Sequence, residues 1–195
     1  MNTNNEDRIL EAALQVVKEN TISGTRMHLI AEKAEMVQSN LHYYYKSKKD
    51  LMLALQKKVL DKCLKIRDDL RNDAEDTLES QLDVFIAQKK AFILAYRDYD
   101  YAEIDFWVQG RIEEEIRLGF AESFSGWRKE IREILDEYVP GLPETYRRNL
   151  PYQFVSYLEG ATIQYLIDEE SFDLDEYFAF GKKMFLDLIE RSMER

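Results

Sequence analysis

The side chains best suited to molecular recognition lie in a short polar stretch near the amino terminus, residues 38–49. On a helical period of 3.6 residues, Ser39, His42 and Tyr43 point outward, and Gln38 and Asn40 flank them. These amide, hydroxyl and imidazole groups can donate and accept hydrogen bonds, which suits base edges and phosphate oxygens. At about 1.5 Å per residue such a helix is roughly 12 Å long, the scale of a DNA major groove. The stretch therefore indicates a helix that contacts duplex DNA.

The other side of the same helix predicts how it is anchored. Val37, Leu41 and Tyr45 recur at the helical period and form a narrow apolar stripe, with Tyr44 beside it. A helix this short cannot be stable alone, so the stripe must pack on neighbouring helices.

Charge is distributed unevenly along the chain. The sequence contains 27 lysines and arginines and 38 aspartates and glutamates, for a formal net charge of -11. Residues 38–58 nevertheless hold five lysines and one aspartate. A basic end on an acidic body favours one orientation toward DNA and a salt-sensitive affinity. The alternative is that Lys46, Lys48 and Lys49 only solvate the start of a helix.

The elements around this stretch predict a helix-turn-helix unit. A first helix is expected from a cap at Asn5 to about Asn20, followed by a turn at residues 23–25 and a second short helix over residues 27–34. Two short helices joined by a tight turn and braced by a longer helix are typical of DNA-reading domains. Residues 47–50 then read as a capping box that opens a long fourth helix.

These residues resemble the TetR family, the tetracycline-repressor-like bacterial transcription regulators. The segments that carry the resemblance are residues 8–13, 30–31 and 41–51 in the amino-terminal part, and residues 156–160, 163–167 and 172–175 near the end. The similarity covers nearly the whole chain, with its strongest part in residues 6–55.

The resemblance implies roles for individual residues in binding double-stranded operator DNA. The residues expected to approach base edges are His28, Gln38, Ser39 and His42. Those expected at phosphates are Asn40, Tyr43, Tyr44 and Lys48, with Thr25 near the cap of the second helix. Two positions depart from the family pattern, because Glu35 and Val37 stand where glycine and a capping hydroxyl residue are usual. Glu35 lacks the freedom of glycine at positive φ, and Val37 has no side-chain capping group.

We expect an all-α fold of about nine helices in two domains. Residues 1–50 form the helix-turn-helix domain, and residues 51–195 form a helical regulatory and dimerisation domain. Its five helices after the fourth are expected at residues 78–98, 99–112, 113–138, 144–168 and 173–193. Without a signal peptide or an apolar run long enough for a membrane span, we expect a cytoplasmic protein with no membrane association. The single cysteine, Cys63, is either a buried core thiol or a redox sensor.

The last two predicted helices carry broad apolar surfaces. The resemblance implies that they pair with a second copy in a four-helix interface, which gives a homodimer with two DNA readers. The residues expected in this interface are Tyr152, Val155, Tyr165, Tyr177, Gly181 and Phe185. The alternative is that these helices only complete a monomeric core.

The body is rich in large aromatic residues. In the family, the middle helices enclose an inducer, commonly an apolar or aromatic molecule, and aromatic walls with a few polar groups suit such a ligand. The residues predicted to line the pocket are Gln88, Phe92, Tyr96, Trp107, Gln109 and Trp127. Aromatic residues at helical spacing can equally form plain core.

Catalytic chemistry finds little support in the sequence. It contains no nucleophile elbow, glycine-rich phosphate loop or zinc-ligand spacing, so we expect neither an enzyme nor a bound cofactor or metal. The resemblance implies a homodimeric repressor that a small apolar or aromatic ligand releases from its operator. Two alternatives stay open: a DNA-binding protein whose body responds to a protein partner or clamps DNA, and a body with enzyme activity.

Overall fold

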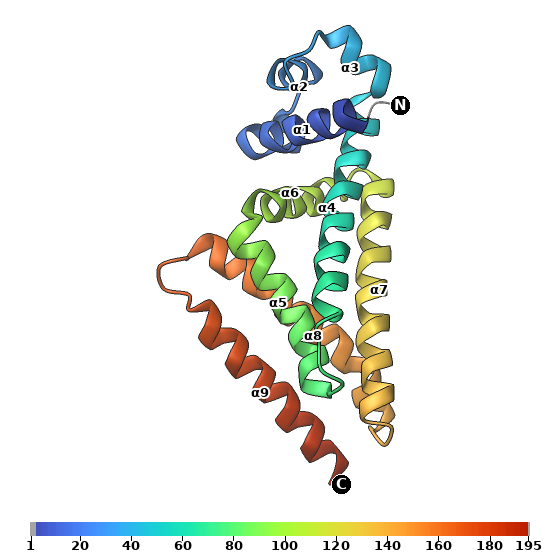
Figure 1. Ribbon diagram of the computed structural model, residues 1–195, viewed down its shortest axis with the longest axis vertical. Helices are drawn as coiled ribbons and strands as arrows, with labels where there is room; N and C mark the ends of the chain where they lie inside the picture. Colours follow the sequence, from blue (N-terminus) through green and yellow to red (C-terminus); the bar gives the residue numbers. More distant parts are fainter. Residues whose placement is uncertain (1–2, 195) are drawn as a thin grey trace. The chain divides into compact units, whose positions relative to one another are not determined.

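The computed structural model describes residues 3–194, and these residues fold as nine helices without a strand (Figure 1). The helices are α1 (Thr3–Gly24), α2 (Met27–Lys33), α3 (Gln38–Tyr44), α4 (Lys48–Arg71), α5 (Leu78–Ala95), α6 (Arg97–Gln109), α7 (Glu114–Tyr138), α8 (Glu144–Ile167) and α9 (Leu174–Met193). The predicted all-α fold is therefore confirmed. The boundary between α5 and α6 lies at Tyr96, two to three residues before its predicted position.

Helix α1 begins earlier than predicted, and its regular part ends where it was predicted to end, at about Asn20. It begins at Thr3, so the predicted cap at Asn5 is wrong, and the Asn5 side chain instead donates to the Tyr44 hydroxyl at 3.0 Å. Regular helical geometry stops at Thr21, whose φ of 59° and ψ of 168° make a kink. A β-branched residue rarely adopts positive φ, so this backbone position is strained.

The turn between α2 and α3 has the hydrogen bonds of a Schellman motif. The Glu35 N–H donates to the Glu32 carbonyl at 3.0 Å, and the Met36 N–H donates to the Ala31 carbonyl at 2.9 Å. Glu35 takes the left-handed conformation that this motif needs, with φ of 52°. The turn therefore forms despite the absence of glycine, at some cost in backbone strain.

Helix α3 is anchored by one residue of its predicted stripe. Leu41 is fully buried among α1, α2 and α4, and Tyr44 and Tyr45 pack partly against the same core. Val37 was expected in this stripe, but it is 68% exposed. The reason is that Val37 is the N-cap residue of α3, where the extended backbone turns its side chain away from the helix face.

The predicted capping box at the start of α4 is confirmed. The Asp50 N–H donates to Ser47 Oγ at 3.1 Å, and the Ser47 N–H donates to Asp50 Oδ2 at 3.0 Å. Leu51, Leu55 and Val59 follow on one side of the helix and are buried. The capping box thus fixes the residue at which α4 begins, shortly after the end of α3 in the chain.

The chain forms two compact units. Unit 1 comprises the residues up to Cys63 together with Tyr96–Ala121, and unit 2 comprises Leu64–Ala95 and Glu122–Arg195. In unit 1, α6 packs along α1, where Asp98 pairs with Lys18 at 2.6 Å and accepts from Gln15 at 3.1 Å. In unit 2, α5 packs on α8 and α9. None of the described helices has both the length and the apolar character that crossing a membrane requires.

Candidate functional site

The outward side of α3 presents the polar groups that its sequence predicts. Gln38, Ser39 and Asn40 are exposed, Tyr43 is 69% exposed, and His42 is half-buried. Gln38 Nε2 lies 3.4 Å from His42 Nε2, one helical turn away. These five polar side chains give the short helix a surface with hydrogen-bond donors and acceptors, which base edges can use. On α2, His28 is also exposed.

Aromatic and basic groups border this surface at its carboxyl-terminal end. The rings of Tyr43 and Tyr44 meet edge to face at 5.3 Å, and the Lys46 ammonium lies 5.8 Å from the Tyr43 ring centre. Tyr44 is half-buried against the core, and its hydroxyl accepts the hydrogen bond from Asn5. Tyr43 and Lys46 are therefore the more accessible pair for a phosphate.

Lys48 and Thr25 make their hydrogen bonds inside the protein. The Lys48 ammonium donates to the Ile22 carbonyl at 2.5 Å, while the Ile22 N–H donates to the Asp105 carboxylate of α6. Desolvation and the nearby Arg26 guanidinium lower the pKa of Lys48. Thr25 is fully buried, and its hydroxyl donates to the Thr21 carbonyl at 2.7 Å. Both residues thus hold the kink at the end of α1, a role that sequence spacing does not reveal.

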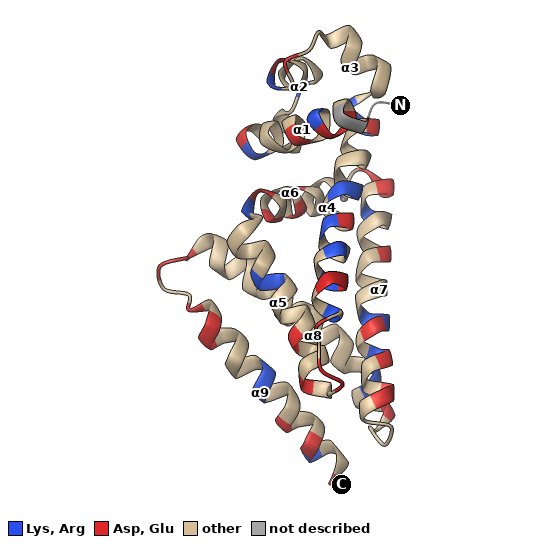
Figure 2. Ribbon diagram, viewed as in Figure 1, with Lys and Arg blue, Asp and Glu red and all other residues tan. Residues whose placement is uncertain are grey.

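The charge around α3 comes from flanking residues, because α3 itself contains no Lys, Arg, Asp or Glu (Figure 2). Lys46 is exposed, whereas Lys49 pairs with Glu115 at 2.6 Å. The hydrogen bond that the Lys49 ammonium donates to Glu115 raises the pKa of Lys49. The outward side of α3 therefore carries no Lys or Arg of its own, and Lys46 is the lysine nearest to it along the sequence.

The comparisons with known proteins agree with this geometry. Residues 9–55, which include α2 and α3, match the family model for bacterial regulatory proteins of the tetR family. The amino-terminal segment is a TetR-family domain. The TetR resemblance of the sequence is thereby confirmed. No match was found among curated proteins.

Solved structures of transcriptional regulators share this fold over nearly the whole chain. A transcriptional regulator from Pseudomonas aeruginosa PAO1 aligns with a TM-score of 0.85 and 15% identity over 95% of this chain and 90% of its own. A regulator from Saccharomonospora viridis in complex with choline gives 0.80 and 18%, over 96% of each chain. FadR from Bacillus subtilis in complex with stearoyl-CoA gives 0.72 and 17%, over 93% and 96%. At these identities the likeness shows the fold alone, over at least 93% of this chain.

The six predicted pocket residues fall into both compact units. Gln88, Phe92 and Trp127 are buried in unit 2. Tyr96, Trp107 and Gln109 belong to unit 1 and are half-buried, with the Lys62 ammonium 4.2 Å from the Tyr96 ring centre. The pocket prediction from sequence did not include the charged residues near Gln88, notably Arg67 and Lys89. A charged residue on an otherwise apolar side of a helix is the sequence pattern that could have indicated them.

The predicted dimer residues lie on different sides of α8 and α9. Tyr152 is exposed and Tyr165 half-exposed, whereas Val155, Gly181 and Phe185 face the interior of their own chain and Tyr177 is half-buried there. Val155, Tyr177, Gly181 and Phe185 therefore pack against residues of their own chain.

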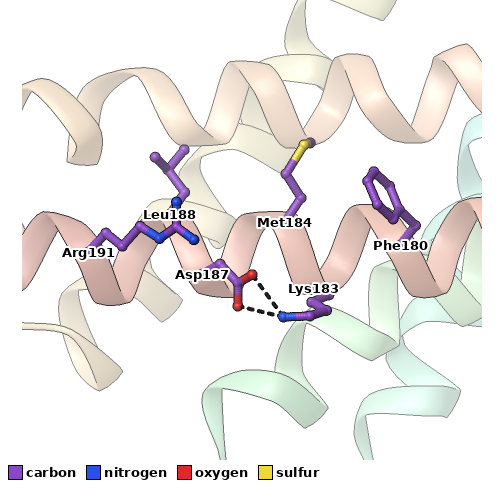
Figure 3. A pocket seen from close by; sticks show the side chains of 6 residues that line it. All are labelled: Phe180, Lys183, Met184, Asp187, Leu188 and Arg191. Atoms are coloured by element: carbon purple, nitrogen blue, oxygen red, sulfur yellow. Dashed lines mark hydrogen bonds and ion pairs between the residues drawn. The ribbon is translucent and has the colours of Figure 1, made fainter.

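The outward side of α9 carries a different apolar row. Phe180, Met184 and Leu188 are exposed and, with Lys183, Asp187 and Arg191, line a groove of about 430 Å³ (Figure 3). Lys183 and Asp187 form an ion pair at 2.8 Å on one side of the row. On α8, Ile163 and Ile167 are exposed as well.

Proposed function

We propose that this protein is a cytoplasmic, homodimeric transcriptional repressor that leaves its operator DNA when a small ligand binds to its body. The observation that carries the proposal is the exposed polar side of α3, held by buried Leu41 in a TetR-family domain. In this proposal Gln38, Ser39 and His42 contact base edges. Tyr43 and Lys46 contact phosphates, which also positions the helix in the major groove.

The proposed dimer forms through the outward sides of α8 and α9. Helix α9 has an exposed apolar row formed by Phe180, Met184 and Leu188. Without a partner, this row is in contact with water. A twofold interface places the same row on both partners, so it can bury itself against its copy. Two α3 helices related by the twofold axis could then contact half-sites about 34 Å apart.

The proposed ligand response is a population shift between two arrangements of the two α3 helices of the dimer. Two of the similar structures hold small molecules, choline in the Saccharomonospora viridis regulator and stearoyl-CoA in Bacillus subtilis FadR. In this chain, buried aromatic residues of unit 2 such as Phe92 and Trp127 supply an apolar environment for a ligand. Because α4 begins in unit 1 and ends in unit 2, its displacement could carry the change to α3.

Selection of bound fragments from genomic DNA tests the proposal. We expect enrichment of a short palindromic sequence, a shifted band in gel electrophoresis and a mass of two chains by light scattering. Genes next to the enriched site would then suggest ligands whose addition should release the DNA. A monomer that retains no specific fragment would contradict the proposal.

A further inference from the structure

The interior of unit 2 contains a group of charged and polar side chains that DNA reading does not use. They come from α4, α5 and α8 and are each at most 8% exposed: Arg67, Gln88, Lys89, Glu159 and Thr162. Side chains of these types are seldom fully buried unless they are paired or bind something.

An ion pair forms the centre of this group. The Lys89 ammonium donates to Glu159 Oε2 at 2.8 Å, across α5 and α8. Removing two charges from water costs free energy that their attraction repays only in part, and an apolar pair of similar size is often as stable. Stability alone therefore gives no reason for placing this pair in the interior of a small helical unit.

The same group contains polar atoms that make no hydrogen bond within the described chain. On α8 these atoms are Glu159 Oε1 and Thr162 Oγ1, which belong to residues one helical turn apart and so share one side of the helix. Two further buried nitrogens, Arg67 Nε and Trp127 Nε1, also make no hydrogen bond within the described chain. Elsewhere on its side chain, the Arg67 guanidinium lies 5.1 Å from the Trp127 ring and pairs with Glu130 at 2.9 Å. Buried polar atoms without partners are rare in folded proteins and call for an explanation.

We propose that Glu159 and Thr162 bind the hydroxyl group of a ligand whose remaining surface is aromatic or apolar. Glu159 Oε1 accepts the hydrogen bond that the ligand hydroxyl donates, and the Thr162 hydroxyl donates to the ligand oxygen. This inference rests on the proposed ligand response and names the chemistry of the ligand.

The charges of this buried group are already paired, which favours binding of a neutral ligand. Lys89 pairs with Glu159 and Arg67 pairs with Glu130, so a ligand ammonium would add an uncompensated positive charge to the interior. A ligand carboxylate would instead place a second negative charge beside Glu159 Oε1. A hydroxyl satisfies the open acceptor and adds no charge.

The aromatic residues of unit 2 suit the rest of such a molecule. The Phe85 ring meets Trp127 at 6.4 Å and Phe154 at 6.3 Å, both edge to face, and Phe92 is buried in the same unit. Aromatic rings prefer edge-to-face or offset packing against other rings, so these side chains suit contact with an aromatic ligand. An alcohol with an aromatic body therefore matches both parts of the site.

Three probes of matched shape test the inference: 3-phenylpropanol, 3-phenylpropylamine and 3-phenylpropionate. The chain has two tryptophans, so Trp107→Phe leaves Trp127 as the single tryptophan reporter of binding. Titration of this variant should show the alcohol binding at least about tenfold more tightly than either charged probe. Thr162→Val should weaken alcohol binding about tenfold, whereas Thr162→Ser, which keeps the hydroxyl, should retain it.

Equal affinities, tighter binding of a charged probe, no binding of the alcohol, or an unchanged affinity in folded Thr162→Val would each overturn the inference. DNA is absent from this titration, so it is separate from the proposed repressor function. Preferential alcohol binding without any effect on operator affinity would support the site and contradict ligand-induced release.

Discussion

The ring of Tyr157 occupies the space that a side chain at Gly181 would need. A Cβ atom at position 181 would lie 2.2 Å from ring carbons of Tyr157, far inside contact distance. Reciprocal hydrogen bonds hold the ring there, because the Tyr157 hydroxyl donates to the Tyr177 carbonyl and the Tyr177 hydroxyl donates to the Tyr157 carbonyl, each at 3.0 Å. The close approach of α8 and α9 within one chain depends on this glycine.

Gly181→Ala should therefore destabilise the protein. The added methyl group must displace the Tyr157 ring and its hydrogen bonds, which we expect to lower the free energy of unfolding by about 1–3 kcal/mol. Gly126→Ala in α7 is the matched control, because a Cβ at that position meets no atom within 4 Å. The control should raise stability by up to about 1 kcal/mol through helix propensity. Urea denaturation of both variants measures the difference, and equal effects would contradict the proposed packing.

Glu35→Gly should stabilise the amino-terminal unit. Glu35 has φ of 52°, where a residue with a Cβ atom is strained and glycine is not. After the larger entropy of glycine in the unfolded chain is subtracted, we expect a gain of about 0.5–1 kcal/mol. Glu35→Ala removes the same carboxylate but keeps the Cβ atom, so it should show no such gain. A similar gain in both variants would assign the effect to charge instead of backbone conformation.

Lys89→Met should be strongly destabilising, and a second substitution should reverse the loss. The single variant leaves Glu159 buried without its cation, which we expect to cost about 3–5 kcal/mol. Lys89→Met combined with Glu159→Leu removes both charges and should unfold with a free energy near or above that of the wild type. A double-mutant cycle from chemical denaturation gives the coupling between the two residues. Additive losses would show that the ion pair does not form.

Stability should fall in alkaline solution as Tyr157 and Tyr177 ionise. Burial raises the pKa of both phenols, and for Tyr157 the neighbouring Tyr177 raises the pKa further. The folded chain thus holds these protons more tightly than the unfolded chain does. Their contribution is complete below about pH 10, the pKa of an unperturbed tyrosine, and is lost as the pH rises toward the folded-state values.

Denaturation at pH 8 and at pH 11 tests this dependence. Tyr157→Phe should be less stable than the wild type at pH 8, because it lacks the hydrogen bonds to the Tyr177 and Phe178 carbonyls. It should also lose less stability between the two pH values, since one raised phenol is absent. A parallel decline in both proteins would exclude Tyr157 as a source of the alkaline sensitivity.

The helices could be predicted from sequence because their signals are local. Apolar periodicity located α2 and α3, the Ser47–Asp50 capping box located the start of α4, and prolines 140 and 143 separated α7 from α8. The kink at Thr21 was not predictable, since its strained φ is held by groups distant in sequence, among them Lys48 and Asp105.

The orientation of the last two helices was harder to predict. Helix α9 is apolar on two sides, with Gly181 and Phe185 directed inward and Phe180 and Met184 exposed. A helix with so wide an apolar surface does not reveal which side faces its own core. The Lys89–Glu159 pair could not be predicted either, because the two residues lie 70 positions apart in sequence. Only the packing of α5 on α8 brings them together.

In the proposed function the exposed side of α3 contacts DNA, and the salt dependence of affinity for the selected operator tests this contact most directly. Tyr43→Ala with Lys46→Gln alters the exposed pair and avoids Lys48, whose ammonium is bound to the Ile22 carbonyl. Lys129→Gln, an exposed lysine on α7, is the matched control. We predict that the double variant binds at least about tenfold more weakly, with a salt slope smaller by about 1, and that the control matches the wild type. Unchanged affinity and slope in the folded double variant would contradict the account.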